Sequence, residues 1–283
     1  MMVRFWGTRG SLATPGLDTV RYGGNTSCVE VRTDAGDLAV LDAGTGIRAL
    51  GREISTDAKR VDVLLSHLHM DHVQGLGFFE CLYREGCQVH LWGPASTTMS
   101  LRARLTRYLS PPLFPVRLRD LPALTLHDVP LGRFEIPGFT VHCALVRHPA
   151  PTVGFRLEAD DAALAYLSDH EPALGVRDFP GPPEWTSGFD LAHDADLLIH
   201  DTQYTDDEYE TRMGWGHSTV AQTVAFVTAV GARTYVPFHY DPTHGDAELD
   251  QMHAAAADAL RGICRVIPAR EGQTLSVTSG GVA

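Results

Sequence analysis

The stretch SHLHMDHVQG, residues 66–75, constrains this chain more than any other feature of its sequence. It follows the apolar run VDVLL and places three histidines and one aspartate within six positions. His67 and His69 are two residues apart, so both side chains point the same way if the strand stays extended. Asp71 and His72 follow where the chain is expected to turn into a helix. One bend can therefore aim two imidazoles at one point and a carboxylate plus an imidazole at a neighbouring point, which suits two adjacent metal ions better than one.

Further metal ligands are expected at the ends of other strands. His148, Asp169 and His239 each follow an apolar run, in the segments LVRHPAPTVGFRLE, ALAYLSDHEP and TYVPFHYDP. Asp42 follows a fourth such run in AVLDAGTG, although a turn aspartate before Gly44 would give the same pattern. Each position alone is weak evidence for a metal ligand. The ends of several strands can, however, lie at the same edge of two packed sheets. We therefore expect these side chains to lie near the histidine-rich bend.

Hydrophobic periodicity divides the chain into two halves, each beginning with strands and continuing with strands and helices in alternation. This order favours an α/β sandwich with two sheets face to face and helices outside. The predicted strands are residues 2–6, 27–32, 38–42, 61–66, 88–92, 133–136, 139–146, 152–158, 162–168, 197–200, 233–237, 264–267 and 273–277. The predicted helices are residues 71–83, 95–108, 218–229 and 246–261.

Charge and composition limit the partners and the compartment. The 35 acidic and 23 basic residues give a formal net charge of −12, whereas proteins that bind long nucleic acid present a basic face. We therefore expect no long nucleic acid as a partner, although a small anion suits a metal-charged pocket. The chain has no apolar stretch of membrane-spanning length, its start lacks the apolar segment of a secretory signal, and its five cysteines form no CxxC pair. These features predict a cytoplasmic protein that does not bind membranes.

An ordered set of short motifs resembles the metallo-β-lactamase superfamily. The set is LDAGTG, HLHMDH, RHP, SDH, IHDTQY, GHST and PFHYDP, and it spans about residues 38–241. HxHxDH marks the superfamily, whereas HDTQY and GHST resemble its phosphodiesterase branch, which includes ribonuclease Z and the cyclic-phosphate phosphodiesterases of phosphonate breakdown. HMDHVQGL is similar to the second of these groups. The resemblance implies an α/β four-layer αββα sandwich, a single hydrolase domain over residues 1–283, and a homodimer as in many relatives.

The resemblance also implies a site for two divalent metal ions. The expected ligands are His67, His69 and His148 for the first ion and Asp71, His72 and His239 for the second, with Asp169 bridging both. Zn²⁺ suits a nitrogen-rich site with carboxylates, and Mn²⁺ or Fe is the alternative. Asp42 is expected to support a metal-binding histidine through a hydrogen bond and not to bind metal itself.

The implied reaction is hydrolysis of a phosphodiester in a small substrate, such as a cyclic phosphate or cyclic nucleotide, by a metal-bound hydroxide. Asp71, His217 and Asp201 are the expected catalytic residues. His217 in GWGHST would protonate the leaving oxygen, and Asp201 in HDTQY would orient it, at a position where relatives often carry glutamate. The competing interpretation makes His217 a surface residue at the start of a helix.

Other substrates and functions compete with this hypothesis. Relatives that process tRNA carry a long arm, commonly between the third histidine and the bridging aspartate, whereas here only residues 149–168 lie between them. The alternatives are a lactonase, thioesterase or β-lactamase of the same superfamily, or a metal-binding sensor without catalysis. Arg9 and Arg21 lie in a Gly-rich loop that either touches a phosphate or packs over a sheet edge. His170 is assigned no role.

Overall fold

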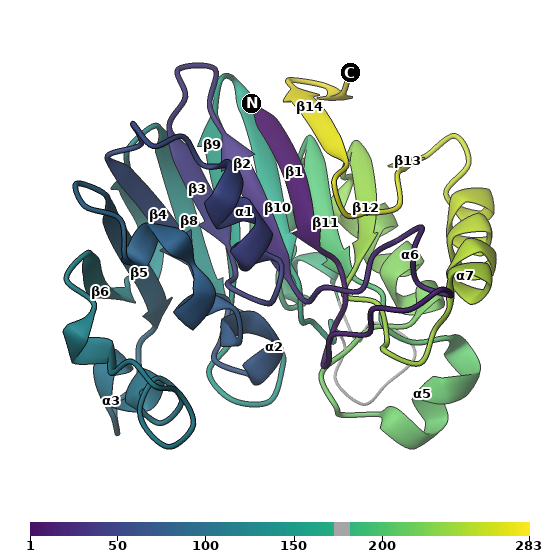
Figure 1. Ribbon diagram of the computed structural model, residues 1–283. Coiled ribbons are helices and arrows are strands. Elements are labelled where there is room, and N and C mark those ends of the chain that lie inside the picture. Colours follow the sequence, from purple (N-terminus) through teal and green to yellow (C-terminus); the bar gives the residue numbers. More distant parts are fainter. Residues whose placement is uncertain (173–181) are drawn as a thin grey trace.

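The computed structural model describes residues 1–172 and 182–283, which form two sheets packed face to face between helices (Figure 1). The first sheet contains β1 (Met2–Gly7), β2 (Cys28–Arg32), β3 (Leu38–Leu41), β4 (Arg60–Leu64), β5 (Gln88–Pro94), β6 (Leu124–Val129), β14 (Thr274–Thr278) and β15 (Gly281–Val282). The second contains β7 (Gly132–Ile136), β8 (Phe139–Leu145), β9 (Val153–Ala159), β10 (Ala162–Leu167), β11 (Leu197–Asp201), β12 (Thr234–Phe238) and β13 (Arg265–Val266). The strand orders are β15-β14-β1-β2-β3-β4-β5-β6 and β13-β12-β11-β10-β9-β8-β7.

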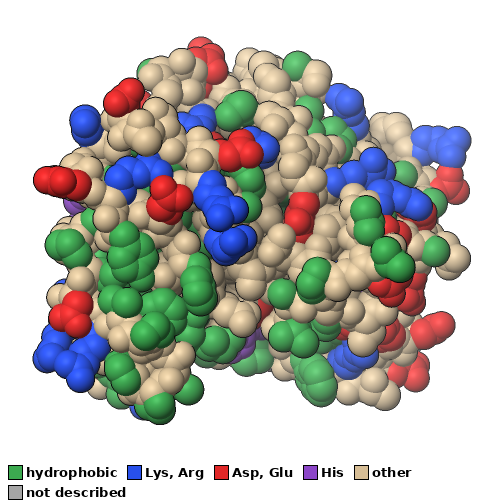
Figure 2. All heavy atoms as spheres, viewed as in Figure 1, with side chains coloured by type: hydrophobic (Ala, Val, Ile, Leu, Met, Phe, Trp, Pro, Cys, Tyr) green, Lys and Arg blue, Asp and Glu red, His purple; other side chains and the backbone are tan. Residues whose placement is uncertain are grey.

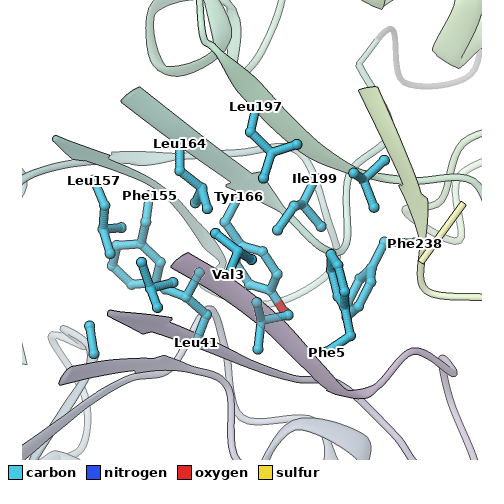
Figure 3. Packing of buried hydrophobic residues seen from close by; sticks show 14 of the residues in the cluster. Val3, Phe5, Leu41, Phe155, Leu157, Leu164, Tyr166, Leu197, Ile199 and Phe238 are labelled. Atoms are coloured by element: carbon cyan, nitrogen blue, oxygen red, sulfur yellow. The ribbon is translucent and has the colours of Figure 1, made fainter. Parts of the chain in front are cut away.

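Three apolar clusters hold the layers together. Side chains of both sheets share the central cluster, in which Val3 and Leu41 of the first sheet face residues such as Tyr166 of the second (Figure 3). The other two clusters cover the outer faces, beneath the helices α1 (Ile47–Glu53), α2 (Met70–Val73) and α3 (Leu101–Thr106) of the first half and α4 (Phe189–Ala192), α6 (Val220–Val230) and α7 (Asp246–Ala259) of the second. The remaining helix is α5 (Asp206–Arg212). The layers therefore run helix, sheet, sheet, helix, which confirms the expected αββα sandwich.

Parallel strands place the motifs at a common edge. β3, β4 and β5 pair in parallel in the first sheet, and β10, β11 and β12 pair in parallel in the second. The carboxyl ends of neighbouring parallel strands meet at the same edge of a sheet, so side chains that follow these strands gather there. The segments that follow β3, β4, β10, β11 and β12 carry most of the motifs, whereas RHP follows β8 and GHST immediately precedes α6.

The predicted helix 71–83 is wrong. The structure has one helical turn over Met70–Val73 and then two 3-10 turns, Leu76–Phe78 and Glu80–Leu82. Gly75 lies so close to Gly44 that a Cβ atom on Gly75 would stand 2.0 Å from the Gly44 carbonyl oxygen. The glycines allow this close packing and also disfavour a continuous helix. The bend is thereby pressed against the segment after β3.

Several other elements differ from expectation. The predicted helix 95–108 begins only at Leu101, because residues 95–99 are irregular and Ser100 caps the helix by accepting a hydrogen bond from the Ala103 backbone. Periodicity gave no sign of β6, β15, α1, α4 or α5. All five cysteines are free. No helix in the described ranges is both long and apolar enough to span a bilayer.

Candidate metal centre

The structure brings the seven predicted ligands together at the rim where strands of both sheets end. The bend at 67–72 follows β4, Asp169 follows β10 and His239 follows β12. His148 lies in the loop between β8 and β9. The ligand atoms form two adjoining groups, and within each group they lie no more than 4.8 Å apart.

The first group consists of His67, His69 and His148. His148 Nε2 lies 3.2 Å from His69 Nδ1, and the rings of His67 and His69 are 4.4 Å apart. His148 Nδ1 donates to the Gly216 carbonyl oxygen at 2.9 Å, which leaves its Nε2 lone pair directed toward the group. His67 is buried, whereas His69 is exposed. This group therefore opens toward solvent at His69.

The second group consists of Asp71, His72, Asp169 and His239, all of them buried. Asp169 Oδ1 lies 3.1 Å from His72 Nε2, and its Oδ2 lies 3.2 Å from His239 Nε2. Asp169 Oδ2 is also 3.8 Å from His148 Nε2 in the first group. The Asp169 carboxylate thus lies between the two groups, where a bridging ligand would have to be.

The chemistry of these donors fits divalent cations. His67 Nε2 and Asp169 Oδ1 are buried and have no hydrogen-bond partner among the described residues, which is costly unless something else satisfies them. Burial, and next the imidazole of His72, lowers the pKa of His67 well below its usual value, so its ring is neutral and offers a lone pair. Neutral imidazoles together with carboxylates are ligands that zinc prefers.

Each group is held from outside by hydrogen-bond acceptors. Asp42 Oδ2 accepts from His72 Nδ1 at 2.8 Å, as expected for a supporting aspartate. Gln203 Oε1 accepts from His239 Nδ1 at 2.8 Å, and the Gly216 carbonyl does the same for His148. Such partners fix the tautomer and orientation of a ligating imidazole. Gln203 and Gly216 lie in the motifs HDTQY and GHST, but the sequence pattern alone does not predict that they support metal-binding histidines.

Replacing Asp42 with asparagine is expected to weaken metal binding about 10–100-fold, the usual cost of losing such a partner. Asp42 also accepts from the Ser66 backbone at 2.7 Å and from the Tyr166 hydroxyl at 2.8 Å, so a neutral amide cannot satisfy all three donors. Competition with a chelator measures the affinity. Tyr166→Phe is the matched control because it removes one hydrogen bond and leaves His72 supported. Equal affinities in native and D42N proteins would contradict this role.

His217 and Asp201 form a buried pair beside both groups. His217 Nδ1 donates to Asp201 Oδ2 at 2.7 Å. The aspartate side chain is therefore long enough to form this hydrogen bond. The backbone amides of Gln203 and Ser218 also donate to Asp201, at 3.0 and 3.2 Å, and hold the carboxylate in place. Burial is the largest cause of both shifts: it raises the pKa of Asp201 well above its usual value and lowers the pKa of His217. The His217 ring stacks on His239 with a centroid distance of 5.0 Å.

The remaining candidates have structural contacts. Arg9 is buried, and its guanidinium donates to the carbonyls of Gly23 and His244. Arg21 is exposed and pairs with Asp250 on α7. His170 is buried with its Nδ1 2.9 Å from His200 Nε2, and its backbone amide donates to Asp201. The Gly-rich N-terminal loop therefore uses Arg9 to hold its own backbone, and His170 supports the pair indirectly.

Comparison with known proteins places this geometry in a family. A model of the beta-lactamase superfamily domain matches residues 39–240. Ribonuclease Z of Haloarcula marismortui is 26% identical over 316 residues, which covers 96% of this chain and 95% of the relative. The structure of Zn²⁺-bound PqqB from Methylobacterium extorquens has a TM-score of 0.70 and 21% identity and covers 98% of this chain and 100% of that one. The short form of human tRNase Z has a TM-score of 0.68, 20% identity and coverage of 98% and 99%.

Fold and site together define a metal-dependent hydrolase with the metallo-β-lactamase fold. Its buried cluster of histidines and aspartates is typical of the dinuclear metal site of that fold. The chain belongs to the beta-lactamase superfamily, in the branch that resembles ribonuclease Z.

Proposed function

We propose that this chain is a dinuclear metal-dependent phosphodiesterase that acts on a small substrate, such as a cyclic phosphate or cyclic nucleotide. The hydrogen-bonded pair of His217 and Asp201 carries the proposal, because it sets an ionisable imidazole beside the two groups of proposed ligands, neither of which includes it. When bound, the two cations lower the pKa of a water molecule and offset negative charge on phosphoryl oxygens.

His217 is proposed to act as the general acid. Its Nδ1 atom donates to Asp201, whereas its Nε2 atom has no hydrogen-bond partner in the described part of the chain. A leaving oxygen could therefore take a proton from Nε2. Asp201 would stabilise the positive charge of the imidazole before that transfer and hold the ring in one orientation.

The proposed ligands of the first ion are His67, His69 and His148, and those of the second are Asp71, His72 and His239. Asp169 would bridge them, in keeping with its 3.1–3.8 Å distances to histidines of both groups. We propose Zn²⁺, with Mn²⁺ or Fe as the alternative, because imidazole and carboxylate suit all three. The Zn²⁺ in the PqqB structure is consistent with this choice.

A small substrate is favoured over tRNA by the segment between the third histidine and the bridging aspartate. Residues 153–159 and 162–167 in that segment are the paired strands β9 and β10, so the segment holds a hairpin and no arm. The net charge of −12 also opposes a polyanion. The similarity to the short form of human tRNase Z makes tRNA the competing substrate.

A substrate panel tests the proposal. Purified, metal-loaded protein is expected to hydrolyse bis(p-nitrophenyl) phosphate and at least one of 2′,3′- and 3′,5′-cyclic AMP, and to bind tRNA only weakly at 150 mM salt. A lactone and a β-lactam are the controls for the other hydrolases of the fold. Hydrolysis of a lactone or β-lactam without any phosphodiester would contradict the proposal, and tight, salt-dependent tRNA binding would contradict the small substrate.

A further inference from the structure

A hollow of about 420 Å³ adjoins the proposed metal centre on the side where that centre is open. Leu68 and Met70, which flank the exposed His69 in the chain, form part of its wall. Val73 of α2 also lines it, and the rest of the wall comes from α3 and the loop that follows it, including Leu105, Tyr108 and Leu113. A larger hollow of about 640 Å³ lies elsewhere and is lined by none of the predicted site residues.

The wall of this pocket is mainly apolar, and part of it is open to solvent. Met70 is 49% exposed and Leu113 is 69% exposed. Hydrophobic side chains gather on the surface around α2 and α3 (Figure 2). Tyr108 is fixed in the wall, since its hydroxyl donates to the Gln74 carbonyl at 2.6 Å. Ligand pockets combine such an apolar lining with a few polar groups that orient the ligand.

The edge of the pocket carries positive charge, in a chain that is strongly acidic. Arg107 lies at this edge, is exposed, and pairs with no carboxylate among the residues that the structure describes. A guanidinium group stacks on planar rings and attracts anions. The pocket is therefore complementary to a planar ring carried by an anion. Its volume is ample, because a cavity of about 150 Å³ already holds benzene.

We propose that this pocket binds a planar aromatic ring, either an aryl group or a nucleobase, that is attached to the phosphorus ester of the substrate. The inference rests on the proposed function and narrows it to ring-bearing phosphoesters. The ring would lie against Leu68, Tyr108 and Leu113 while its phosphoryl group reaches the ligands at His69. The position of Leu68 and Met70 on either side of His69 makes both contacts possible for one small molecule.

The test compares two pairs of ligands by calorimetry on the metal-loaded protein. Phenylphosphonate and methylphosphonate differ in the aryl ring, and AMP and ribose 5-phosphate differ in the nucleobase. We expect about tenfold tighter binding of the ring-bearing member of at least one pair, from burial of the ring. The pair that shows this preference identifies the ring as aryl or nucleobase.

Two variants test whether the preference for the ring-bearing ligand arises in this pocket. Leu113→Asp places a charge at its mouth and Leu113→Trp fills it, and both are expected to reduce the preference to about twofold or less. Leu131→Asp is the matched control, since Leu131 is 59% exposed and lies in the turn between β6 and β7. The control is expected to keep the full preference.

Equal binding of both members of each pair in the native protein would overturn the inference. So would a preference that survives both changes at Leu113, or a dimer in sedimentation analysis that Leu113→Asp dissociates, because a second copy would then cover the pocket. A ring preference without hydrolysis of bis(p-nitrophenyl) phosphate would support the ring site and count against the proposed function instead. Failure of the ring site and failure of the proposed phosphodiesterase function therefore give different results.

Discussion

The His217→Ala variant is expected to lose activity on a phosphodiester by about 10²–10⁴-fold in kcat, the usual contribution of a general acid. It is expected to keep about two equivalents of bound metal, because His67, His69, His148 and the second group stay intact. Steady-state kinetics and metal analysis on the same preparation measure both. His253→Ala is the matched control, since His253 is also buried but packs against Tyr22, away from the site.

Loss of metal in His217→Ala would contradict its role as an acid. His217 lies near enough to His148 and Asp169, with His217 Nδ1 4.0 Å from Asp169 Oδ2, for it to be a ligand instead. Comparing leaving groups that do and do not need protonation tests the role of His217 more specifically. The loss is expected to be much smaller with p-nitrophenolate as leaving group than with an alkoxide such as a ribose oxygen, because only the alkoxide requires an acid.

The Asp169→Asn variant is expected to bind at most about one metal equivalent and to lose about a thousandfold or more in activity. The carboxylate lies between histidines of both groups, 3.1 Å from His72 Nε2 and 3.8 Å from His148 Nε2, so an amide removes one negative charge from both ions. Each ion contributes several kcal/mol of charge stabilisation, and each 1.36 kcal/mol corresponds to a factor of ten in rate.

Asp62→Asn is the control for burial. Asp62 is equally buried but pairs with Arg60 at 2.7 Å, near the start of β4 and not at the carboxyl end that leads into the site. We expect it to keep its metal and its activity. Two tightly bound equivalents in Asp169→Asn would show that this residue does not bridge the ions.

The sequence predicted which side chains converge better than it predicted the local fold. Strand ends could be read from apolar runs, and parallel pairing brings the ends that precede Asp169 and His239 together. His148 joins them because β8 and β10 both pair antiparallel with β9 and so run in the same direction. The distances that make Asp169 central depend on how the two sheets pack, which no local pattern encodes. The hydrogen-bond acceptors of His239 and His148, which are Gln203 and the Gly216 carbonyl, could not be predicted for the same reason.

The helices and strands that were not predicted lack a clear periodicity of apolar residues. α5 has the sequence DDEYETR and buries only Tyr209, so its helical pattern is nearly invisible. Its one local signal is the capping box of Thr205 and Glu208, in which each side chain bonds to the other residue's backbone. β6 is half exposed along its length and mixes polar with apolar residues. Tertiary contacts, not propensity, fix both elements.

Metal analysis of freshly purified native protein tests the central claim most directly. The claim is that seven side chains from both sheets hold a pair of divalent cations. Two equivalents of metal per chain are expected, and their removal by a chelator is expected to abolish phosphodiester hydrolysis until metal is restored. A protein that holds no metal after incubation with Zn²⁺, Mn²⁺ or Fe²⁺, or that hydrolyses phosphodiesters equally well without it, would contradict the account.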